Sequence, residues 1–303
     1  QSTIQFIDRQ SWGHIVDTIE QNGVLLSTIA NVHQGLVTGA NQTTNNLEPH
    51  GVSRHGLFVL QTKNPYDARI IEEIKTEDSL LLKPLGKNSN IHPFSIEFDN
   101  NQYVLYLHKN LPLSSKSHPR VFQHVTPARS ILEKRREVEF KRIPWWALTW
   151  PRNEDIFSER CIVTPYRSTS VSFALNTKGL YYTSDCTMVV VDDSKIDRYF
   201  LLGYLNSTVF ECWYRLKGKN RGTMLEFLAH PLQQVPIPRL SEEIELQISK
   251  TVRTLEYIED TDSRWLLEVK TTQDTIDQIL FKSLNLSLAQ QRQMYKFVQQ
   301  FAS

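Results

Sequence analysis

The sequence predicts an α+β fold in which a region of short strands with interspersed helices is followed by a C-terminal helical tail. Through the first two thirds of the chain, runs of β-branched and aromatic residues are bounded by Gly, Asn, Pro and Asp, which is typical of strands. After Pro238 the apolar residues instead recur every three or four positions, as they do on one face of a helix. With 303 residues, of which 40% are hydrophobic, the chain can bury a full core as one large domain or two smaller ones.

The first region contains predicted strands and predicted helices. Strands are expected at residues 56–61, 102–107, 160–164 and 187–191. Thr126-Pro127 resembles an N-cap with proline at the first helical position, so a helix is expected from there to about Glu139. Ser194 with Asp197 resembles a capping arrangement for a second helix, which is expected to break near Asn206-Ser207.

The tail is predicted from its apolar spacing and from one capping signal. A first apolar series has steps of four, four, three and three, and a second runs from Leu266 to Leu280. A final helix is expected from Ser287, because Gln290 three residues later completes a capping box. We therefore predict two units, at 1–240 and at 241–303. The first series consists of Ile244, Ile248, Val252, Leu255 and Ile258.

Six short segments follow one another between roughly residues 25 and 240. Alone they carry no chemistry, since Asn-Ser can interrupt a helix and Pro-Ile-Pro can be a rigid extended exit from a domain. The segments are QGLVTGAN at 34–41, LKPLGKNSNI at 82–91, LEKR at 132–135, CIVTP at 161–165, LNSTV at 205–209 and VPIP at 235–238. In this order they resemble the C-terminal specificity domain of TaqI-like adenine-N6 DNA methyltransferases.

The resemblance implies sequence-specific recognition of double-stranded DNA, while a separate catalytic domain holds S-adenosylmethionine and methylates a flipped adenine. The catalytic domain is expected in the same longer chain, as in a methyltransferase or a fused restriction-modification enzyme, or in a partner subunit. The start at Gln1 instead of Met also suggests a piece of something longer. We expect no active site in this chain, because it lacks a Gly-x-Gly pair and Asn64-Pro65-Tyr66 is interpreted as a turn.

The distribution of charge favours DNA as the partner of the first region. Residues 241–303 hold 7 Lys and Arg against 10 Asp and Glu, whereas residues 1–240 hold 27 against 23. Residues 215–222 carry four cations, two glycines and no acid, as expected of a mobile loop that neutralises phosphates. We predict phosphate contacts from Lys217, Lys219 and Arg221, with a solvated surface turn as the alternative.

Base contacts are predicted from the turns that follow the motif segments. Arg167 offers a fork-shaped cation for guanine, and small hydroxyl side chains follow it. Each candidate has the alternative of being an ordinary exposed turn residue. The predicted residues are Asn41, Gln42 and Thr43, then Lys87, Asn88 and Asn90, and finally Arg167, Ser168 and Thr169.

Several other classes of protein are excluded by composition. Cys161, Cys186 and Cys212 are isolated, so buried thiols are expected instead of disulfides or a metal site. No apolar run approaches the ~18 residues of a membrane span, and no leader opens the chain, so a cytoplasmic protein is expected. The tryptophans at 145, 146 and 150 lie beside cations, which suits a platform for unpaired bases, but a structural cluster in the core is the preferred interpretation.

A second function stays open from the sequence. The chain could be an interaction scaffold, similar to a specificity subunit, whose helical tail docks a methylation or nuclease subunit. In that case DNA binding would require the partner protein. The tail could equally be an intramolecular helical hairpin that docks nothing.

Overall fold

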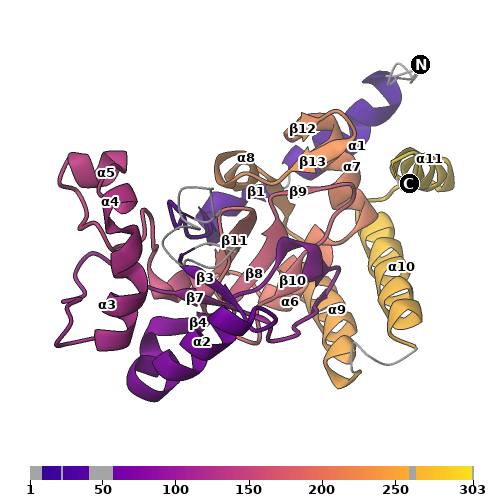
Figure 1. Ribbon diagram of the computed structural model, residues 1–303. Helices are drawn as coiled ribbons and strands as arrows, with labels where there is room; N and C mark the ends of the chain where they lie inside the picture. Colours follow the sequence, from indigo (N-terminus) through magenta and orange to yellow (C-terminus); the bar gives the residue numbers. More distant parts are fainter. Residues whose placement is uncertain (1–8, 22, 41–56, 259–263, 302–303) are drawn as a thin grey trace.

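The computed structural model describes residues 9–21, 23–40, 57–258 and 264–301, which form an α+β fold around a central antiparallel sheet (Figure 1). The strand order in this sheet is β10–β8–β11–β2, and every neighbouring pair is antiparallel. The predicted strands at 160–164 and 187–191 are confirmed as β8 and β11. The strands are β2 (Ala30–Gln34), β8 (Cys161–Pro165), β10 (Ala174–Leu175) and β11 (Cys186–Val191).

The central sheet separates two apolar cores, because successive side chains of a strand point to opposite faces. Ile162 and Val189 belong to the first core, whereas Val163 and Met188 belong to the second. The second core also contains a smaller sheet with the order β3–β7–β4, which confirms strands within 56–61 and 102–107. Its elements are β3 (Val59–Gln61), β4 (Leu82–Pro84), β7 (Gln102–Leu105), α2 (Pro65–Asp78) and α3 (Pro119–Val125).

The predicted helix from Thr126 to Glu139 is confirmed only as separate short helices, because it is not continuous. The helix of this region is α3, which begins at Pro119, and the Thr126 hydroxyl donates to the Phe122 carbonyl near its C-terminal end. Pro127 lacks the N–H that a continuing helix needs, and the backbone at Arg135 is extended. The chain therefore breaks into η5 (Thr126–Ala128), α4 (Arg129–Leu132) and α5 (Arg136–Glu139).

The predicted helix break near Asn206-Ser207 is confirmed, because α6 (Arg198–Leu205) ends there and α7 (Thr208–Lys217) begins. The capping prediction with Ser194 is corrected. The N-cap of α6 is Asp197, whose carboxylate accepts from the backbone N–H groups of Tyr199 and Phe200. The Ser194 hydroxyl donates to Asp192 instead.

The smaller β-elements border the first region. β1 (Gly23–Leu25) pairs with β14 (Pro236–Pro238), and β5 (Ile91–His92) pairs with β6 (Ser95–Ile96). A three-stranded sheet has the order β12–β13–β9. Its strands are β9 (Arg167–Ser168), β12 (Asn220–Arg221) and β13 (Met224–Glu226). The remaining elements of this region are α1 (Arg9–Gln21), η1 (Leu26–Thr28), η3 (Ser79–Leu81), η4 (Asn88–Asn90), η6 (Glu154–Phe157) and α8 (Ala229–Gln233).

The tail forms helices that pack into the first core. They are α9 (Glu242–Arg253), η7 (Thr254–Tyr257), α10 (Trp265–Ser283) and α11 (Leu288–Gln299), and α11 carries the predicted capping box of Ser287 and Gln290. α9 lies so close to α6 that a Cβ at Gly203 would come within 2.8 Å of Ile248. The predicted inward position of Leu266 is wrong, since this side chain is 80% exposed.

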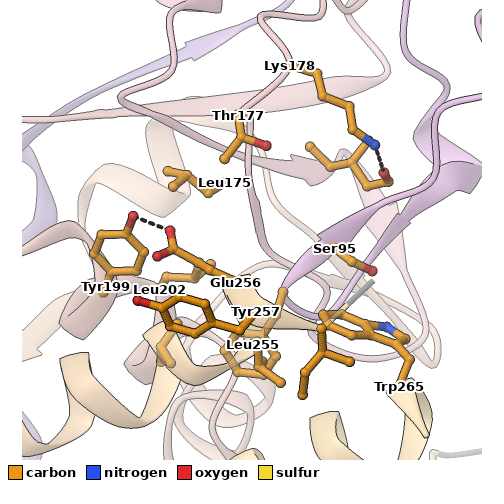
Figure 2. Close-up of a pocket in the computed structure, with 14 residues that line it drawn as sticks. Ser95, Leu175, Thr177, Lys178, Tyr199, Leu202, Leu255, Glu256, Tyr257 and Trp265 are labelled. Carbon is orange, nitrogen blue, oxygen red and sulfur yellow. Dashed lines mark hydrogen bonds between the residues drawn. The ribbon is translucent and has the colours of Figure 1, made fainter. Parts of the chain in front are cut away.

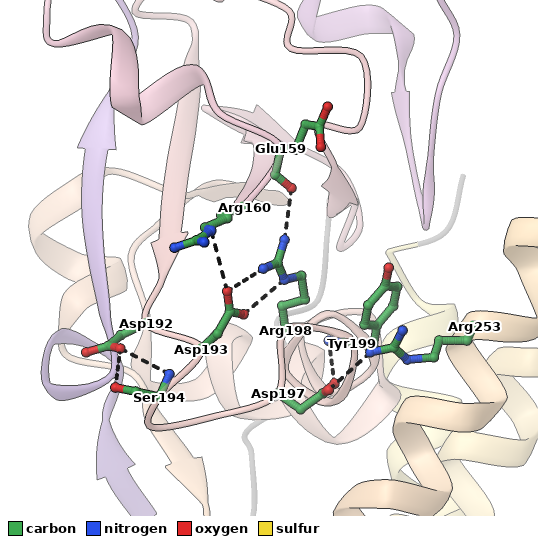
Figure 3. Close-up of polar contacts among 9 residues, drawn as sticks. All are labelled: Glu159, Arg160, Asp192, Asp193, Ser194, Asp197, Arg198, Tyr199 and Arg253. Atoms are coloured by element: carbon green, nitrogen blue, oxygen red, sulfur yellow. Dashed lines mark hydrogen bonds and ion pairs between the residues drawn. The ribbon is translucent and has the colours of Figure 1, made fainter.

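Polar contacts at the N-terminus of α6 also tie the tail to the first region (Figure 3). The Asp197 carboxylate caps α6, accepts a hydrogen bond from the Ser249 hydroxyl and pairs with Arg253 at 3.3 Å. Arg253 also lies over the Tyr199 ring, 3.7 Å from its centroid. One carboxylate thus joins α6 to α9. None of the helices in the described ranges is both long and apolar enough to cross a membrane.

Candidate DNA interface

The first motif segment brings β2 against the chain around Thr183. A Cβ at Gly35 would lie 2.2 Å from the Thr183 carbonyl oxygen, so only glycine permits this approach. Gly39 has a φ of +78°, which L-residues with a side chain rarely adopt, and it lies against the Thr149 hydroxyl. The glycines of this segment therefore serve the packing of the backbone.

Arg135, from the third motif segment, holds separate segments together. Its guanidinium donates to the carbonyl oxygens of Trp145 at 2.6 Å, Thr38 at 3.3 Å and Leu132 at 3.2 Å. Burial lowers the pKa of this arginine to about 10. Since these donors are used inside the protein, Arg135 joins the first and third motif segments to the tryptophan cluster.

Asn206, from the fifth motif segment, fixes the break between α6 and α7. Its amide oxygen accepts from the Phe173 N–H at 2.9 Å, and its amide nitrogen donates to the Phe173 carbonyl at 2.8 Å. The Ser207 hydroxyl caps α7 by accepting from the Phe210 N–H. We call Gly35, Gly39, Arg135, Asn206 and Ser207 the motif frame, because their side chains or backbones hold the fold and do not point to a ligand.

The β12–β13–β9 sheet brings two predicted sites together. Leu225 pairs with Ser168 and Glu226 with Arg167, while Asn220 and Arg221 form the neighbouring strand. The predicted base-reading residues after β8 and the predicted phosphate contacts at the end of α7 and beyond thus lie on or beside one small sheet near the top of the molecule in Figure 1. This proximity joins positions about fifty residues apart in the sequence.

The interpretation of residues 215–222 as a mobile loop is corrected. Arg215 is 9% exposed and pairs with Glu211 on the same helix at 2.6 Å. It also donates to the carbonyl oxygens of Thr223 at 3.2 Å and of Thr169. Residues 220–226 then form a hairpin, so this segment is folded and one of its four cations is internal.

Glu226 is the buried centre of the small sheet. Its side chain is 6% exposed and accepts from Arg167 Nε at 2.8 Å and from the Tyr166 hydroxyl at 3.4 Å. Lys219 Nζ lies 3.9 Å from its other oxygen. The Arg167 guanidinium also stands over the Tyr166 ring, 4.7 Å from the centroid. Arg167 is therefore held on its Nε side, and its Nη1 has no hydrogen-bond partner in the described part of the chain.

The other predicted contacts of this sheet are at its surface. Lys217 Nζ lies 3.6 Å from Glu20 of α1, and Arg221 is exposed without an ion pair to any described carboxylate. The Ser168 hydroxyl accepts from the Ser170 N–H at 3.4 Å. Thr169 is exposed, and its carbonyl accepts from Arg215.

The remaining predicted contacts are not brought to this sheet by any described interaction. Lys87 precedes η4 and lies 3.8 Å from Asp99, while Asn90 donates to the Glu97 carbonyl at 3.3 Å. Asn88, also in η4, is half-buried. Asn41, Gln42 and Thr43 lie outside the described residues.

The tryptophan cluster differs from the prediction at one position. Trp146 is buried and Trp145 half-buried, as the structural interpretation requires, but Trp150 is 52% exposed. Exposed cations, including Lys141 and Arg142, accompany it. Sequence reasoning missed this surface because it treated the three tryptophans as one group. Pro151 directly after Trp150 was the available signal that the chain leaves the core there.

A hollow of about 510 Å³ lies between the β5–β6 turn, β10 and the tail helices (Figure 2). Its charged side chains already have partners: the Tyr199 hydroxyl donates to Glu256, and Lys178 Nζ donates to the Ile96 carbonyl at 3.3 Å. The two charged side chains of the hollow are therefore held by the protein itself and do not form a free acid–base pair.

Asn64-Pro65-Tyr66 and the cysteines have structural surroundings in the described part of the chain. The Asn64 amide oxygen accepts from the N–H groups of Tyr66 and Asp67 and thereby caps α2, so this segment opens a helix and is no isolated turn. Among the described residues, no group of His, Cys, Asp and Glu could hold a metal ion. The three cysteines are free and buried, as predicted.

The chain is similar to DNA methyltransferases and to a domain of that family. The model of the TaqI-like C-terminal specificity domain matches residues 83–237. Type II methyltransferase M.MjaIV of Methanocaldococcus jannaschii is 25% identical over 272 residues, which cover 86% of this chain and 81% of that protein. Type II methyltransferase M.HincII of Haemophilus influenzae is 29% identical over 108 residues, covering 33% of this chain and 22% of its own length.

Among solved structures, the type IIL restriction-modification enzyme MmeI, determined in complex with DNA, matches with a TM-score of 0.58. The match covers 92% of this chain and 36% of MmeI at 11% sequence identity, so it shows a shared fold. This chain thus spans about a third of MmeI and about a fifth of M.HincII.

Proposed function

The chain belongs to the family of TaqI-like C-terminal specificity domains, and from this premise we propose that it reads its DNA target through the β12–β13–β9 sheet. Its role is DNA target recognition, and the comparisons favour this role over that of a scaffold. The proposal concerns which residues touch the DNA. The observation that carries it is the Glu226 carboxylate, which gathers Arg167 and Lys219 on one exposed sheet.

Arg167 is proposed to read a guanine. A guanidinium has five N–H donors, and Glu226 and Tyr166 engage those of Nε and one of Nη2. The Nη1 and remaining Nη2 donors form the edge that can bond guanine O6 and N7 together. Because the carboxylate and the Tyr166 ring restrict the side chain, less conformational entropy is lost when that contact forms.

Lys217, Lys219 and Arg221 are proposed to contact phosphates on either side of the base that Arg167 reads. Their side chains lie on or beside the same sheet, and phosphate contacts fix the register of a reader on the duplex. Asn41, Gln42, Thr43, Lys87, Asn88, Asn90, Ser168 and Thr169 stay as further proposed contacts.

Methylation itself is proposed to belong to a catalytic domain outside this chain, in the same protein or in a partner subunit. The residues here do not fit a site for the methyl donor, since the Asn64 amide oxygen already caps a helix. We expect calorimetric titration of this chain with S-adenosylmethionine to give no binding heat.

The proposed reading contact is tested with Arg167→Lys. The preferred duplex would first be selected from a random pool, and affinities then measured by fluorescence anisotropy on this duplex and on a scrambled one. Lysine keeps the charge but cannot reproduce the rigid fork, so we expect the preferred site to weaken by about 1–3 kcal/mol and the scrambled duplex to be unaffected. Equal losses on both duplexes would contradict base reading by Arg167.

Glu226→Gln is the matched positioning variant. Glutamine keeps an oxygen that can accept from Arg167 Nε but removes the charge that holds the guanidinium. If Glu226 orients Arg167, this variant lowers the preference for the selected site while Arg167 is still present. A purely structural Glu226 would instead lower thermal stability and leave the ratio of the two affinities unchanged.

A further inference from the structure

A surface remote from the β12–β13–β9 sheet carries cations that no carboxylate neutralises. Lys109, Lys134, Arg136, Lys141 and Arg142 are all exposed, and within the described residues none of them forms an ion pair. We call these five residues the unpaired cations. Glu133 of this segment pairs with Arg129 at 2.7 Å, and neither Glu137 nor Glu139 comes within ion-pair distance of a cation. By contrast, Arg167, Lys217 and Lys219 each have a carboxylate nearby.

Exposed aromatic rings lie among the unpaired cations. Trp150 is 52% exposed, with the Arg152 guanidinium 5.8 Å from its ring centroid, and Phe140 is 60% exposed, with that of Arg142 at 5.5 Å. Large aromatic side chains on a surface are costly to leave in water, and they gather at sites that bind another flat or apolar group.

A hollow of about 420 Å³ opens beside Trp150. Leu148 and Ile143 supply apolar contact, and Asn110 supplies an amide that can donate and accept. The hollow shares Lys109, Asn110 and Arg142 with a second one of about 530 Å³, so the two form one continuous depression. The lining combines the apolar side chains of Ile143, Leu148 and Trp150 with the cations Lys109, Lys141 and Arg142, and it also includes the carboxylates Glu133 and Glu137.

The backbone on both sides of this depression is in an unusual conformation. Lys141 has a φ of +56° and Arg152 a φ of +67°, both in the left-handed region that costs about 1–3 kcal/mol for such residues. The Arg152 position is held by its Nε donating to the Gly35 carbonyl at 3.2 Å and by the Tyr106 hydroxyl donating to its own carbonyl. Strain of this kind gathers at ligand sites, where it positions side chains.

We propose that this depression binds an unpaired nucleotide of a DNA strand, whose base stacks on Trp150 while Lys109, Lys141 and Arg142 hold its phosphates. An aromatic face between cations suits single strands, because every base has a face to stack and every nucleotide a phosphate to neutralise. An acidic protein surface would neutralise the cations but would offer no flat or apolar group to cover the exposed Trp150 ring. This inference goes beyond duplex recognition by the β12–β13–β9 sheet, and either can fail without the other.

The test uses Trp150→Ala in the full chain and a fluorescent short oligothymidylate. The backbone of Trp150 pairs with Val37 through its N–H and carbonyl, so the fold does not depend on the indole. Stacking of one base is worth roughly a five- to 150-fold change in affinity, and we expect a loss of that size for the oligonucleotide. Affinity for the preferred duplex is expected to stay unchanged.

Two further variants control this test. Tyr257→Ala removes an aromatic side chain that is 88% exposed on η7, outside the depression, and we expect it to have no effect on oligonucleotide binding. The double variant Lys141→Ala and Arg142→Ala is expected to weaken the oligonucleotide and to lower the dependence of its affinity on salt.

Three outcomes would overturn the proposal. The first is that the unsubstituted chain does not bind oligothymidylate, and the second is that Trp150→Ala binds it as tightly as the unsubstituted chain. The third is that polyglutamate displaces the oligonucleotide as well as unlabelled oligothymidylate does, which would indicate an acidic protein partner for this surface.

Discussion

Arg135 lies in the motif frame and Arg167 lies on the β12–β13–β9 sheet, and the two guanidinium groups are held in opposite ways. Arg135 donates to backbone carbonyls from three segments, so its donors are consumed inside the protein. Arg167 is held by one carboxylate and one hydroxyl on the same sheet and keeps a free edge. The difference indicates that Arg135 serves the assembly of the fold, whereas Arg167 keeps donors that a ligand can use.

The cations at the end of α7 and in the hairpin that follows also divide into one buried residue and three exposed ones. Arg215 is buried between Glu211 and two carbonyls, whereas Lys217, Lys219 and Arg221 are exposed. The composition of the segment gives these four cations equal weight. The structure shows that Arg215 supports the sheet, whereas the other three cations can face a ligand.

The largest effect is expected from Arg135→Ala. The substitution removes three part-buried hydrogen bonds of a charged donor, and at ~1–1.5 kcal/mol for each bond we expect the unfolding free energy to fall by about 3–4 kcal/mol. Arg167→Lys is the matched control at the exposed sheet, with an expected change below about 1 kcal/mol. Urea unfolding of both variants measures the difference. Equal losses would break the distinction between frame and exposed sheet.

Much of the fold was predictable because its signals are local. The Ser287 and Gln290 capping box is written in four consecutive residues, and β11 is a run of β-branched residues that stays apolar on both faces. The break at Asn206-Ser207 was predictable for the same reason, since both side chains favour caps.

What failed depends on partners far away in the sequence. The helix expected through Glu139 breaks at Arg135, whose side chain reaches the Thr38 carbonyl 97 residues away. The pairing of Arg167 with Glu226 spans 59 residues, and no local pattern encodes the register of such short strands. The candidate residues were therefore found singly, and their assembly on one sheet was not.

The second-largest effect on stability is expected at Asp277, through which the tail supports the start of α7. Asp277 of α10 is 2% exposed and accepts from the Thr208 N–H at the start of α7 at 2.8 Å. Burial raises the pKa of this carboxyl from its ordinary 3.8 to about 7. Ionisation is thus easier in the unfolded chain, so this group costs the folded state nothing below pH ~4 and increasingly more as the pH rises to about 7.

Asp277→Asn keeps an oxygen for the Thr208 N–H and removes the buried charge. We expect unfolding free energy to increase by roughly 2–4 kcal/mol above pH 7, since each pKa unit corresponds to ~1.4 kcal/mol, and to change little near pH 4. Thermal unfolding across this pH range measures it. A loss of stability confined to pH values above 7 would show that the carboxylate supports α7 as an ion.

The helices α9 and α10 pack into the first core, so deleting residues 241–303 would expose that core. Substitutions are therefore better tests of the tail than this deletion.

The smallest effect on folding, and the one most specific to the exposed sheet, is expected from replacing Lys217, Lys219 and Arg221 together by alanine. Lys217 and Lys219 are about half exposed in their pairs with Glu20 and Glu226, and such pairs contribute at most about 1 kcal/mol each to stability. The fold is therefore expected to survive.

On duplex DNA, the same three cations would each release a counterion when they contact a phosphate. The log-log dependence of affinity on salt is then expected to flatten by about 0.9 per lost contact, to the same extent on preferred and scrambled duplexes. Lys282→Ala, an exposed cation on α10, is the control and leaves the slope unchanged. An unaltered slope in the triple variant would remove the hairpin from the interface. Flattening on the preferred duplex alone would instead assign base reading to these residues, and the division between Arg167 as reader and the hairpin as phosphate contact would be wrong.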